Sequence, residues 1–214
     1  MKRRLRLFFL CSFLLQMAAA GGIKDVFEQM PDSVLCLLTH NNRLDLIDFA
    51  ESNMEAKVKN SLGGMARLRK LRQKWIDLEP TEATRLQLAL LPVAGSDSAQ
   101  IVCLVRTWVI PQVESEILFY TTDWHPLDGA KYVRMPQWRD FLMLPQNQTE
   151  ADRARVLQQA DAAVMAARLE ENGELRFSLS LDGGFTDVRE ELRPFLCSEL
   201  VYQWDGRTFR PIGD

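Results

Sequence analysis

The sequence has 214 residues, a length that fits one large domain or two small ones. Hydrophobic residues make up 47% and charged residues 26% of the chain, a balance that excludes a disordered, collagen-like or purely coiled-coil protein. Acidic residues outnumber basic ones, with a formal net charge of −3, and a negative surface argues against nucleic acid and anionic lipid as partners.

The first twenty residues are predicted to form a cleavable signal peptide. A basic start over residues 1–6 precedes an apolar run over residues 7–15, and Ala18–Ala20 supply the small residues that signal peptidase accepts. The apolar run is about half as long as a membrane-spanning helix. We therefore expect an exported mature chain that begins at Gly21 and has no transmembrane segment.

Three cysteines remain after removal of the leader, an odd number for an oxidising compartment. Cys36 and Cys103 lie in apolar runs and are expected to be small buried hydrophobes, whereas Cys197 is expected to be partly buried. The spacing leaves open whether two of them form a disulfide. No CxxC motif or His/Cys cluster indicates zinc, and neither a metal nor another cofactor is expected.

Residues 21–64 are predicted to form an N-terminal helical region. A short amphipathic helix comes first, and a helical turn begins at Pro31, where proline needs no amide donor. From Leu44 to Asn60 the apolar residues recur at helical spacing. Asn42 is expected to cap this last helix, and Gly63-Gly64 to end it.

Residues 65–134 are predicted to form an antiparallel β-meander. The basic stretch Met65–Gln73 is ambiguous between a helix and a loop, and after it the apolar period changes from 3.6 to 2. Short turns join the expected strands, of which the one around Leu86–Leu90 reads as half-buried. The expected strands cover residues 75–78, 85–90, 100–110 and 116–123.

Residues 135–214 are predicted to alternate helices and hairpins. Asn172-Gly173 and Asp205-Gly206 mark the turns of the two hairpins, because such pairs accept the positive φ that tight hairpin turns need. The predicted class is α+β, with a helical region, the meander, and then a helix–hairpin–helix–hairpin order. The two β regions could form one continuous sheet or two lobes. The expected helices cover residues 135–144, 149–160 and 185–196.

Short segments spread along the mature chain carry a family resemblance. They are Lys24–Phe27, Gln29–Ser33, Asn41–Asp45, Ile47–Phe49, Leu62–Gly64, Phe119–Trp124, Pro126-Leu127 and Tyr202–Gly206. In these segments the chain resembles an uncharacterised family of exported Bacteroidales proteins, known only as a domain of unknown function. The resemblance implies a periplasmic or secreted protein of a Gram-negative cell and supplies no activity. The basic stretch Arg67–Lys74 departs from the more polar, less charged segment expected there.

Catalysis is weakly indicated, because the chain has only two histidines. His40 lies at a helix junction and His125 in a loop before proline, and the chain has no Gly-x-Ser-x-Gly motif. A hydrolytic triad needs a histidine beside an activated Ser or Cys and an orienting carboxylate. The alternative that stays open is a small periplasmic hydrolase in which His125 works with Asp123 or Asp128.

Two groups of residues are candidates for binding, and His125 is a further one. Trp124 and Trp138 lie in loop or helix-start positions and could form an exposed platform for a sugar or a protein. Asn41, Arg43 and Asp45 form the most polar patch, although capping and local ion pairs explain them more simply than a ligand site.

The leading functional hypothesis is a non-catalytic binding module that contacts a protein or a glycan in the periplasm through its sheet face or loop rim. A folding or envelope-maintenance factor is a third reading. If the family resemblance holds, Asp97-Ser98-Ala99 is similar to the O-glycosylation signal of that bacterial group, and Ser98 is then the acceptor.

Overall fold

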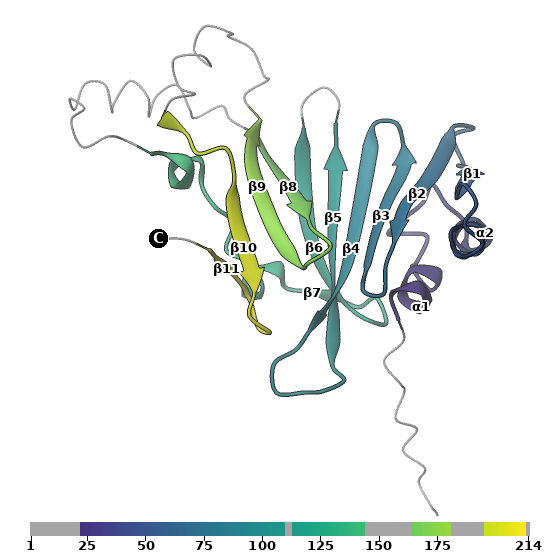
Figure 1. Ribbon diagram of the computed structural model, residues 1–214, viewed down its shortest axis with the longest axis horizontal. Coiled ribbons are helices and arrows are strands. Elements are labelled where there is room, and N and C mark those ends of the chain that lie inside the picture. The colour runs from purple at the N-terminus through teal and green to yellow at the C-terminus, as the bar shows by residue number, and fades with distance from the viewer. Residues whose placement is uncertain (1–21, 110–112, 144–163, 181–194, 213–214) are drawn as a thin grey trace, which may run out of the picture.

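The computed structural model describes residues 22–109, 113–143, 164–180 and 195–212 (Figure 1). Within these residues the protein consists of two antiparallel sheets and two short α-helices. The predicted α+β class is therefore wrong, because the fold is mainly β. The expected leader and the helices expected over 149–160 and 185–196 lie outside the described residues, apart from the last two positions of the latter.

The larger sheet has seven strands that follow one another in chain order as a meander. The expected meander is present, and it is longer than predicted because β1 and β2 come from the regions expected to be helical or ambiguous. Its strands are β1 (Lys57–Lys59), β2 (Met65–Leu71), β3 (Trp75–Thr81), β4 (Thr84–Pro92), β5 (Gln100–Trp108), β6 (Glu114–Thr121) and β7 (Pro126–Leu127).

The smaller sheet has four strands in the order β11-β10-β9-β8. Both predicted hairpins are present, and the pairing of β9 with β10 joins them into this one sheet. The two β regions of the chain therefore form two separate sheets. Between the meander and the smaller sheet lie two 3-10 turns, at Gly129–Lys131 and Trp138–Phe141, and the second replaces the helix expected over 135–144. The strands are β8 (Val164–Leu169), β9 (Glu174–Ser180), β10 (Leu200–Trp204) and β11 (Phe209–Pro211).

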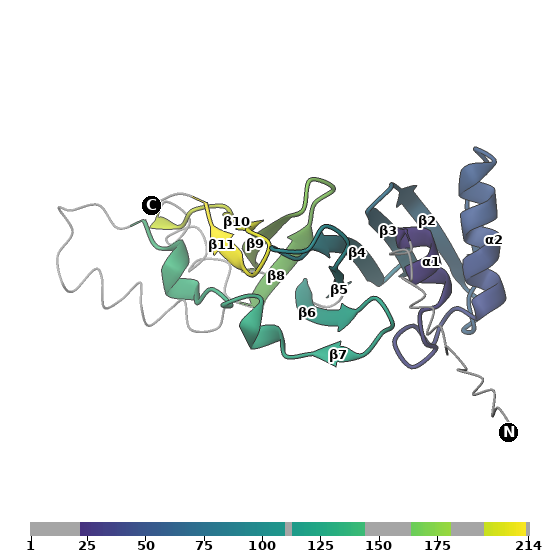
Figure 2. The ribbon, with the colours of Figure 1, turned by 90° about the horizontal axis from the view of Figure 1, so that it is seen from below.

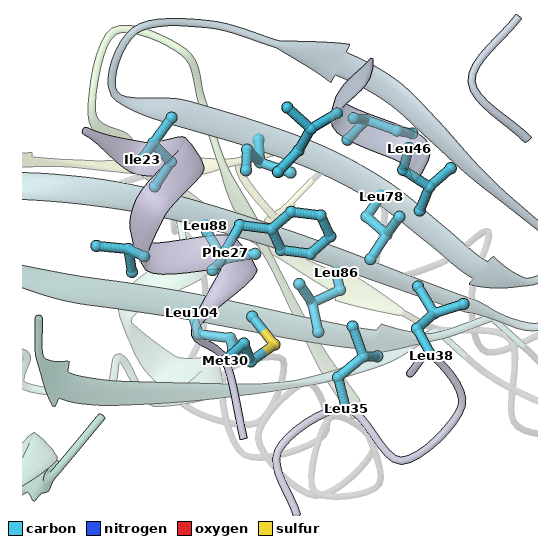
Figure 3. Close-up of a cluster of buried hydrophobic side chains, with 14 of the residues drawn as sticks. Ile23, Phe27, Met30, Leu35, Leu38, Leu46, Leu78, Leu86, Leu88 and Leu104 are labelled. Carbon is cyan, nitrogen blue, oxygen red and sulfur yellow. The ribbon is translucent and has the colours of Figure 1, made fainter. Parts of the chain in front are cut away.

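The helices α1 (Ile23–Glu28) and α2 (His40–Glu51) lie together beside the larger sheet, as Figure 2 shows. We call the sheet face that they cover the helix side. Figure 3 shows the core on this side, where Phe27, Met30 and Leu46 pack against leucines of β3, β4 and β5. None of the described helices is long and apolar enough to cross a membrane.

The predicted helix over 44–60 ends early, at Glu51. The final residues form β1 instead, where Val58 is buried between two lysines that point away from the core. Gly63-Gly64 lies in the β1–β2 turn rather than at a helix end, and the buried side chain of Asn60 organises that turn by accepting hydrogen bonds from the amides of Leu62 and Gly64. Three residues are too few for their alternating pattern to be distinguished from the helical spacing that precedes them.

The central strands β4 and β5 are buried on both faces, so the strand predicted to be half-buried is fully enclosed. Leu86 and Leu88 face the helix side, while Ala89 and Leu91 belong to a second core between the two sheets. We call this opposite face of the larger sheet the far side. The polar residue Gln87 also points to the far side and is buried there.

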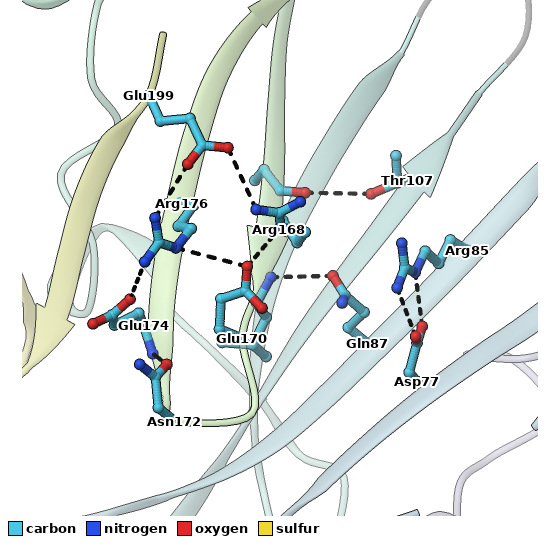
Figure 4. A network of polar contacts seen from close by, with 12 residues as sticks. Asp77, Arg85, Gln87, Thr107, Arg168, Glu170, Asn172, Glu174, Arg176 and Glu199 are labelled. Atoms are coloured by element: carbon cyan, nitrogen blue, oxygen red, sulfur yellow. Dashed lines mark hydrogen bonds and ion pairs between the residues drawn. The ribbon is translucent and has the colours of Figure 1, made fainter. Parts of the chain in front are cut away.

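Side chains from the far side of the larger sheet make hydrogen bonds to the backbone amides and carbonyls on the outer edge of β8. The indole Nε1 of Trp75 donates to the carbonyl of Leu169 at 3.0 Å, and the amide of Leu169 donates to Oε1 of Gln87 at 3.1 Å. The Ser115 hydroxyl donates to the carbonyl of Ala167 at 3.2 Å, and the Thr107 hydroxyl reaches the same oxygen (Figure 4). The outer side of an edge strand has no neighbouring strand to pair with its amides and carbonyls. These side chains take the place of such a strand.

Replacing Gln87 by leucine tests how much its hydrogen bond with the Leu169 amide stabilises the protein. The substitution keeps the volume of the side chain but leaves the buried Leu169 amide without an acceptor, so the free energy of unfolding should fall by about 1–3 kcal/mol. Urea unfolding followed by circular dichroism measures the change.

The matched control is Gln73→Leu in the exposed β2–β3 turn, where the same substitution should change stability by no more than about 0.5 kcal/mol. Equal stability of the two variants would show that the Gln87 contact contributes nothing.

Candidate functional site

A small cleft lies where the two sheets meet, at the end of the molecule that holds the β2–β3 and β8–β9 turns (Figure 1). Its volume is about 220 Å³. Apolar residues at the end of β4 form its floor, and Trp204 of β10 lines it. We call it the Trp204 cleft, and its lining residues are Lys74, Ala89, Leu90, Leu91, Pro92, Glu171, Asn172, Gly173, Gln203 and Trp204.

Trp204 is held in a fixed orientation by its neighbours. Its Nε1 donates to the carbonyl of Pro92 at 2.6 Å, and its ring meets the ring of Phe209 edge-on with 5.2 Å between the centroids. Because the N–H group is already bonded to the protein, the ring itself is what the indole can offer to a ligand.

The turn after Trp204 docks against the β4–β5 turn. The amide of Ala94 donates to the carbonyl of Gly206 at 2.8 Å. Gly206 has φ +92°, and a Cβ there would lie 2.8 Å from the Cβ of Ala94, so only glycine fits this close approach. Amides of Thr208 and Arg207 donate to the Asp205 carboxylate, which lowers the pKa of Asp205 and fixes the turn.

Four polar side chains surround the opening of the Trp204 cleft. Lys74 and Gln203 are exposed and have no side-chain hydrogen bond or ion pair with the described residues. Oδ1 of Asn172 accepts from the amide of Glu174 at 3.0 Å, which leaves the NH₂ group of Asn172 as a donor. Glu171 pairs with Arg72 at 3.0 Å and so ties the β8–β9 turn to the β2–β3 turn.

Beyond the cleft, the outer face of the smaller sheet carries a network of charged residues (Figure 4). Arg168 and Arg176 stand directly opposite each other in the β8–β9 register, an arrangement that repels unless carboxylates intervene. Glu170 lies 2.7 Å from Arg168, and Glu199 contacts both arginines. The hydrogen bonds that Arg176 donates to Glu199 and Glu174 raise the pKa of Arg176. These carboxylates are therefore engaged in neutralising arginines.

A second ion pair lies on the far side of the larger sheet. Arg85 binds Asp77 through two hydrogen bonds, of 2.7 Å and 2.6 Å, and the Asp77 side chain is only 4% exposed. The bonds to Asp77 raise the pKa of Arg85. A buried carboxylate that is bridged in this way is a structural group, because both of its oxygens already accept a hydrogen bond from the same guanidinium.

Another cleft, of about 250 Å³, lies between residues 33–37 and the ends of β3, β4 and β5. We call it the Cys36 cleft. Arg106 closes one side, because it donates to the carbonyl of Val34 and pairs with Glu116. Trp108 stands at its rim and is 38% exposed. The lining is mainly apolar, and its hydrogen-bonding side chains include Ser33, Thr84 and Arg106.

The structure buries Trp124, which corrects the expectation of an exposed platform at this residue. Its side chain is 7% exposed, and its Nε1 donates to the carbonyl of Val26 at 2.9 Å. Its φ of +64° turns the chain so that the ring enters the core beside Tyr120. Trp138 is half-buried, with the Arg139 guanidinium 5.3 Å from its ring centroid.

His125 is exposed, and its Nδ1 lies 3.2 Å from the carbonyl of Asp123. Within the described residues neither the Asp123 nor the Asp128 carboxylate pairs with the ring, and Asp128 instead accepts from the amide of Ala130. The His125–carboxylate pair of the hydrolase hypothesis is therefore not assembled in this structure.

The polar patch at the start of α2 separates into one buried and two exposed residues. Arg43 is 3% exposed and donates to the carbonyls of Glu28 and Leu38 and to Asp32, so it joins α1, the following loop and α2. Asn41 and Asp45 are exposed.

The cap of α2 is Thr39 rather than Asn42, because the Thr39 hydroxyl accepts from the amide of Asn42 while Oδ1 of Asn42 accepts from the amide of Thr39. Asn42 is the third helical residue in this reciprocal arrangement.

Ser98 lies in the exposed β4–β5 turn, as expected, and its modification stays a prediction. Cys36, Cys103 and Cys197 are free thiols. Cys103 is buried as predicted, and burial raises its pKa, whereas the prediction for Cys36 is wrong because this thiol is exposed. Partial burial raises the pKa of Cys197.

Local sequence patterns carry little signal for the Trp204 cleft. The Asn172-Gly173 and Asp205-Gly206 turns beside it are recognisable as hairpin turns, but nothing in the sequence around Trp204 indicates a cleft. The role of Trp204 depends on the meeting of β10 with the end of β4, which are more than 100 residues apart in the chain.

The comparisons agree with this mainly β fold. Residues 15–209 match the profile of a family described as "Protein of unknown function (DUF3256)", and the chain belongs to this family. A domain of an uncharacterized protein from Porphyromonas gingivalis W83 has the same fold, with a TM-score of 0.74 and 24% identity over 90% of this chain and 98% of that domain. The comparison with curated proteins gives no match.

The accessibility of the thiols gives a direct test of this arrangement. In a folded chain of residues 21–214, Cys36 should react with a thiol reagent within seconds to minutes, Cys197 more slowly, and Cys103 only after denaturation, because a buried thiol with a raised pKa supplies almost no thiolate.

Time-resolved labelling at pH 8 followed by mass spectrometry identifies each site. In Cys36→Ser the fast phase should vanish. A fast phase that persists in this variant, or a chain that binds no reagent before reduction, would contradict the assignment.

Proposed function

We propose that this protein is a non-catalytic, exported binding module that takes a glycan in the Trp204 cleft. The observation that carries the proposal is the placement of a fixed tryptophan beside a ring of exposed polar side chains. An aromatic ring packs against the C–H face of a sugar, while amide and carboxylate groups pair with its hydroxyls.

The size of the cleft indicates that it holds a small unit of a larger ligand. A volume of about 220 Å³ is below the range of about 300–1,000 Å³ that is typical for drug-sized ligands. It suits one ring of a glycan chain, with the rest of the chain outside. The binding groups are also held in place by the two docked turns, so little ordering is needed on binding.

The lining of the cleft favours binding over hydrolysis. Glycosidases generally place two carboxylates about 5–9.5 Å apart across the scissile bond. The residues that line this cleft include a single carboxylate, Glu171, and it is paired with Arg72. The nearby glutamates of the smaller sheet are paired with Arg168 and Arg176.

Export is part of the proposal and is supported by the leader pattern of residues 1–20. In the native cell the mature protein should begin at Gly21 and lie outside the cytoplasm. N-terminal sequencing of the protein from a periplasmic or culture-supernatant fraction measures this. A natural product that begins at Met1 would contradict export.

Binding is tested with the mature chain on an array of oligosaccharides, with affinities then measured by calorimetry. Gln203→Ala should weaken binding by roughly two- to tenfold, the value of one hydrogen bond, and Trp204→Ala should weaken it by tenfold or more. Because Trp204 also packs against Phe209, circular dichroism must show that this variant is folded.

The matched control is Trp108→Ala, which removes an exposed tryptophan at the Cys36 cleft and should leave glycan binding unchanged. The proposal fails if no glycan binds, or if Trp108→Ala weakens binding while Gln203→Ala does not.

A further inference from the structure

The basic residues of this acidic chain are concentrated in one segment. Residues 57–74 contain seven of the 26 basic residues and no Asp or Glu, so the rest of the chain has 19 basic residues against 29 acidic ones. We call this set the basic strip, and it consists of Lys57, Lys59, Arg67, Arg69, Lys70, Arg72 and Lys74.

Strands β1 and β2 present part of this strip on the far side of the larger sheet. Val58, Ala66 and Leu68 point to the helix side and are buried. Alternation along a strand therefore places Lys57 and Arg67 on the opposite face. These two residues are also directly opposite each other in the β1–β2 register, an arrangement that costs stability because like charges repel.

Part of this charge is neutralised within the protein, because Arg69 pairs with Glu79 and Arg72 with Glu171, each at 3.0 Å, but the lysines are not paired in this way. Within the described residues, none of the four lysines of the strip has an ion-pair partner. Arg67 has only Glu55, at 4.0 Å, and both side chains are about half exposed or more. The arginines of the smaller sheet differ, because glutamates stand on several sides of them. The four lysines and Arg67 are thus the part of the basic strip that is available to an external anion.

The strip leads into the Trp204 cleft. Lys74 is a lining residue of the cleft, and Arg72 is tied to the β8–β9 turn through Glu171. From this turn β2 runs away from the cleft for its seven residues, a distance of about 23 Å, and a register shift against β3 between Leu68 and Lys70 interrupts the alternation of its side chains. A ligand chain anchored at Trp204 and directed past Lys74 would meet these charges in succession.

We propose that the ligand of the Trp204 cleft is an anionic glycan, whose carboxylate, sulfate or phosphate groups are bound by the basic strip along β2. This inference rests on the proposed glycan-binding function. A protein that is acidic as a whole would repel such a polymer, and the strip supplies the local attraction that overcomes this repulsion. The continuity of the strip with a sugar-sized cleft favours a glycan over an acidic protein.

The experiment compares charged and neutral forms of the same polymers, using the full mature chain. Polygalacturonate and its methyl ester form one pair, and dextran sulfate and dextran form the other, so that carboxylate and sulfate are tested separately. We expect binding to a charged form that is at least tenfold tighter than to its neutral form and that weakens as NaCl is raised, because exposed charges are screened.

Two double variants remove equal charge from different places. Lys70→Gln with Lys74→Gln should weaken binding of the charged polymer by roughly three- to thirtyfold, the range for two exposed charge contacts. Lys24→Gln with Lys131→Gln removes two lysines outside the strip and should leave binding unchanged. Gln203→Ala should again weaken binding, because the cleft holds the same ligand.

The outcomes separate the two proposals. If a neutral glycan binds and depends on Gln203, but neither salt nor the Lys70/Lys74 variant affects it, the anionic inference is overturned and the glycan site stands. If poly-L-glutamate binds as tightly as the charged polysaccharides and Gln203→Ala has no effect, the strip is a surface for acidic proteins and both proposals fail.

Discussion

The structure depends on the contact between the outer edge of β8 and the far side of the larger sheet. Trp75, Gln87 and Ser115 satisfy backbone groups of Ala167 and Leu169 that an adjacent strand would otherwise satisfy. Because the bonds are directional, they fix where β8 crosses β3, β4 and β6, which hydrophobic packing alone would define less sharply. The position of the smaller sheet follows, and so does the position of the β8–β9 turn beside the β2–β3 turn, where the Trp204 cleft forms.

Two cores stabilise this arrangement from opposite faces of the larger sheet. On the helix side, α1 and α2 cover leucines of β3–β5, and on the far side the smaller sheet covers residues such as Ala89, Cys103 and Phe119. The middle of the meander is thus buried on both faces, while the far side of β1 and β2 is exposed. The same layering lets long basic side chains of β1 and β2 extend into water on the far side.

Local features of the fold were predictable, and long-range ones were not. The hairpin turns at Asn172-Gly173 and Asp205-Gly206 were recognised because their glycines take positive φ, of 81° and 92°. The helix over 44–60 was overextended because Val58 and Met54 continue its spacing, although β1 pairs with β2. Trp124 is buried although an exposed platform was expected there, because the exposure of a tryptophan depends on its partners, here Val26, about 100 residues away in sequence. The orientation of Trp204 depends in the same way on Pro92, also about 100 residues away. Without those partners, the sequence could not locate the cleft.

The most direct test of the β8 contact is amide hydrogen exchange of the native protein, followed by NMR. The amide of Leu169 lies on the outer edge of an edge strand, yet it should be protected about 10⁴-fold or more, as a central β4 amide would be, because Gln87 accepts its hydrogen bond in the interior. The amide of Ser98, in the exposed β4–β5 turn, supplies the unprotected reference. Exchange of Leu169 at the rate of Ser98 would show that the edge of β8 is open to water, and the account of how the two sheets are joined would be wrong.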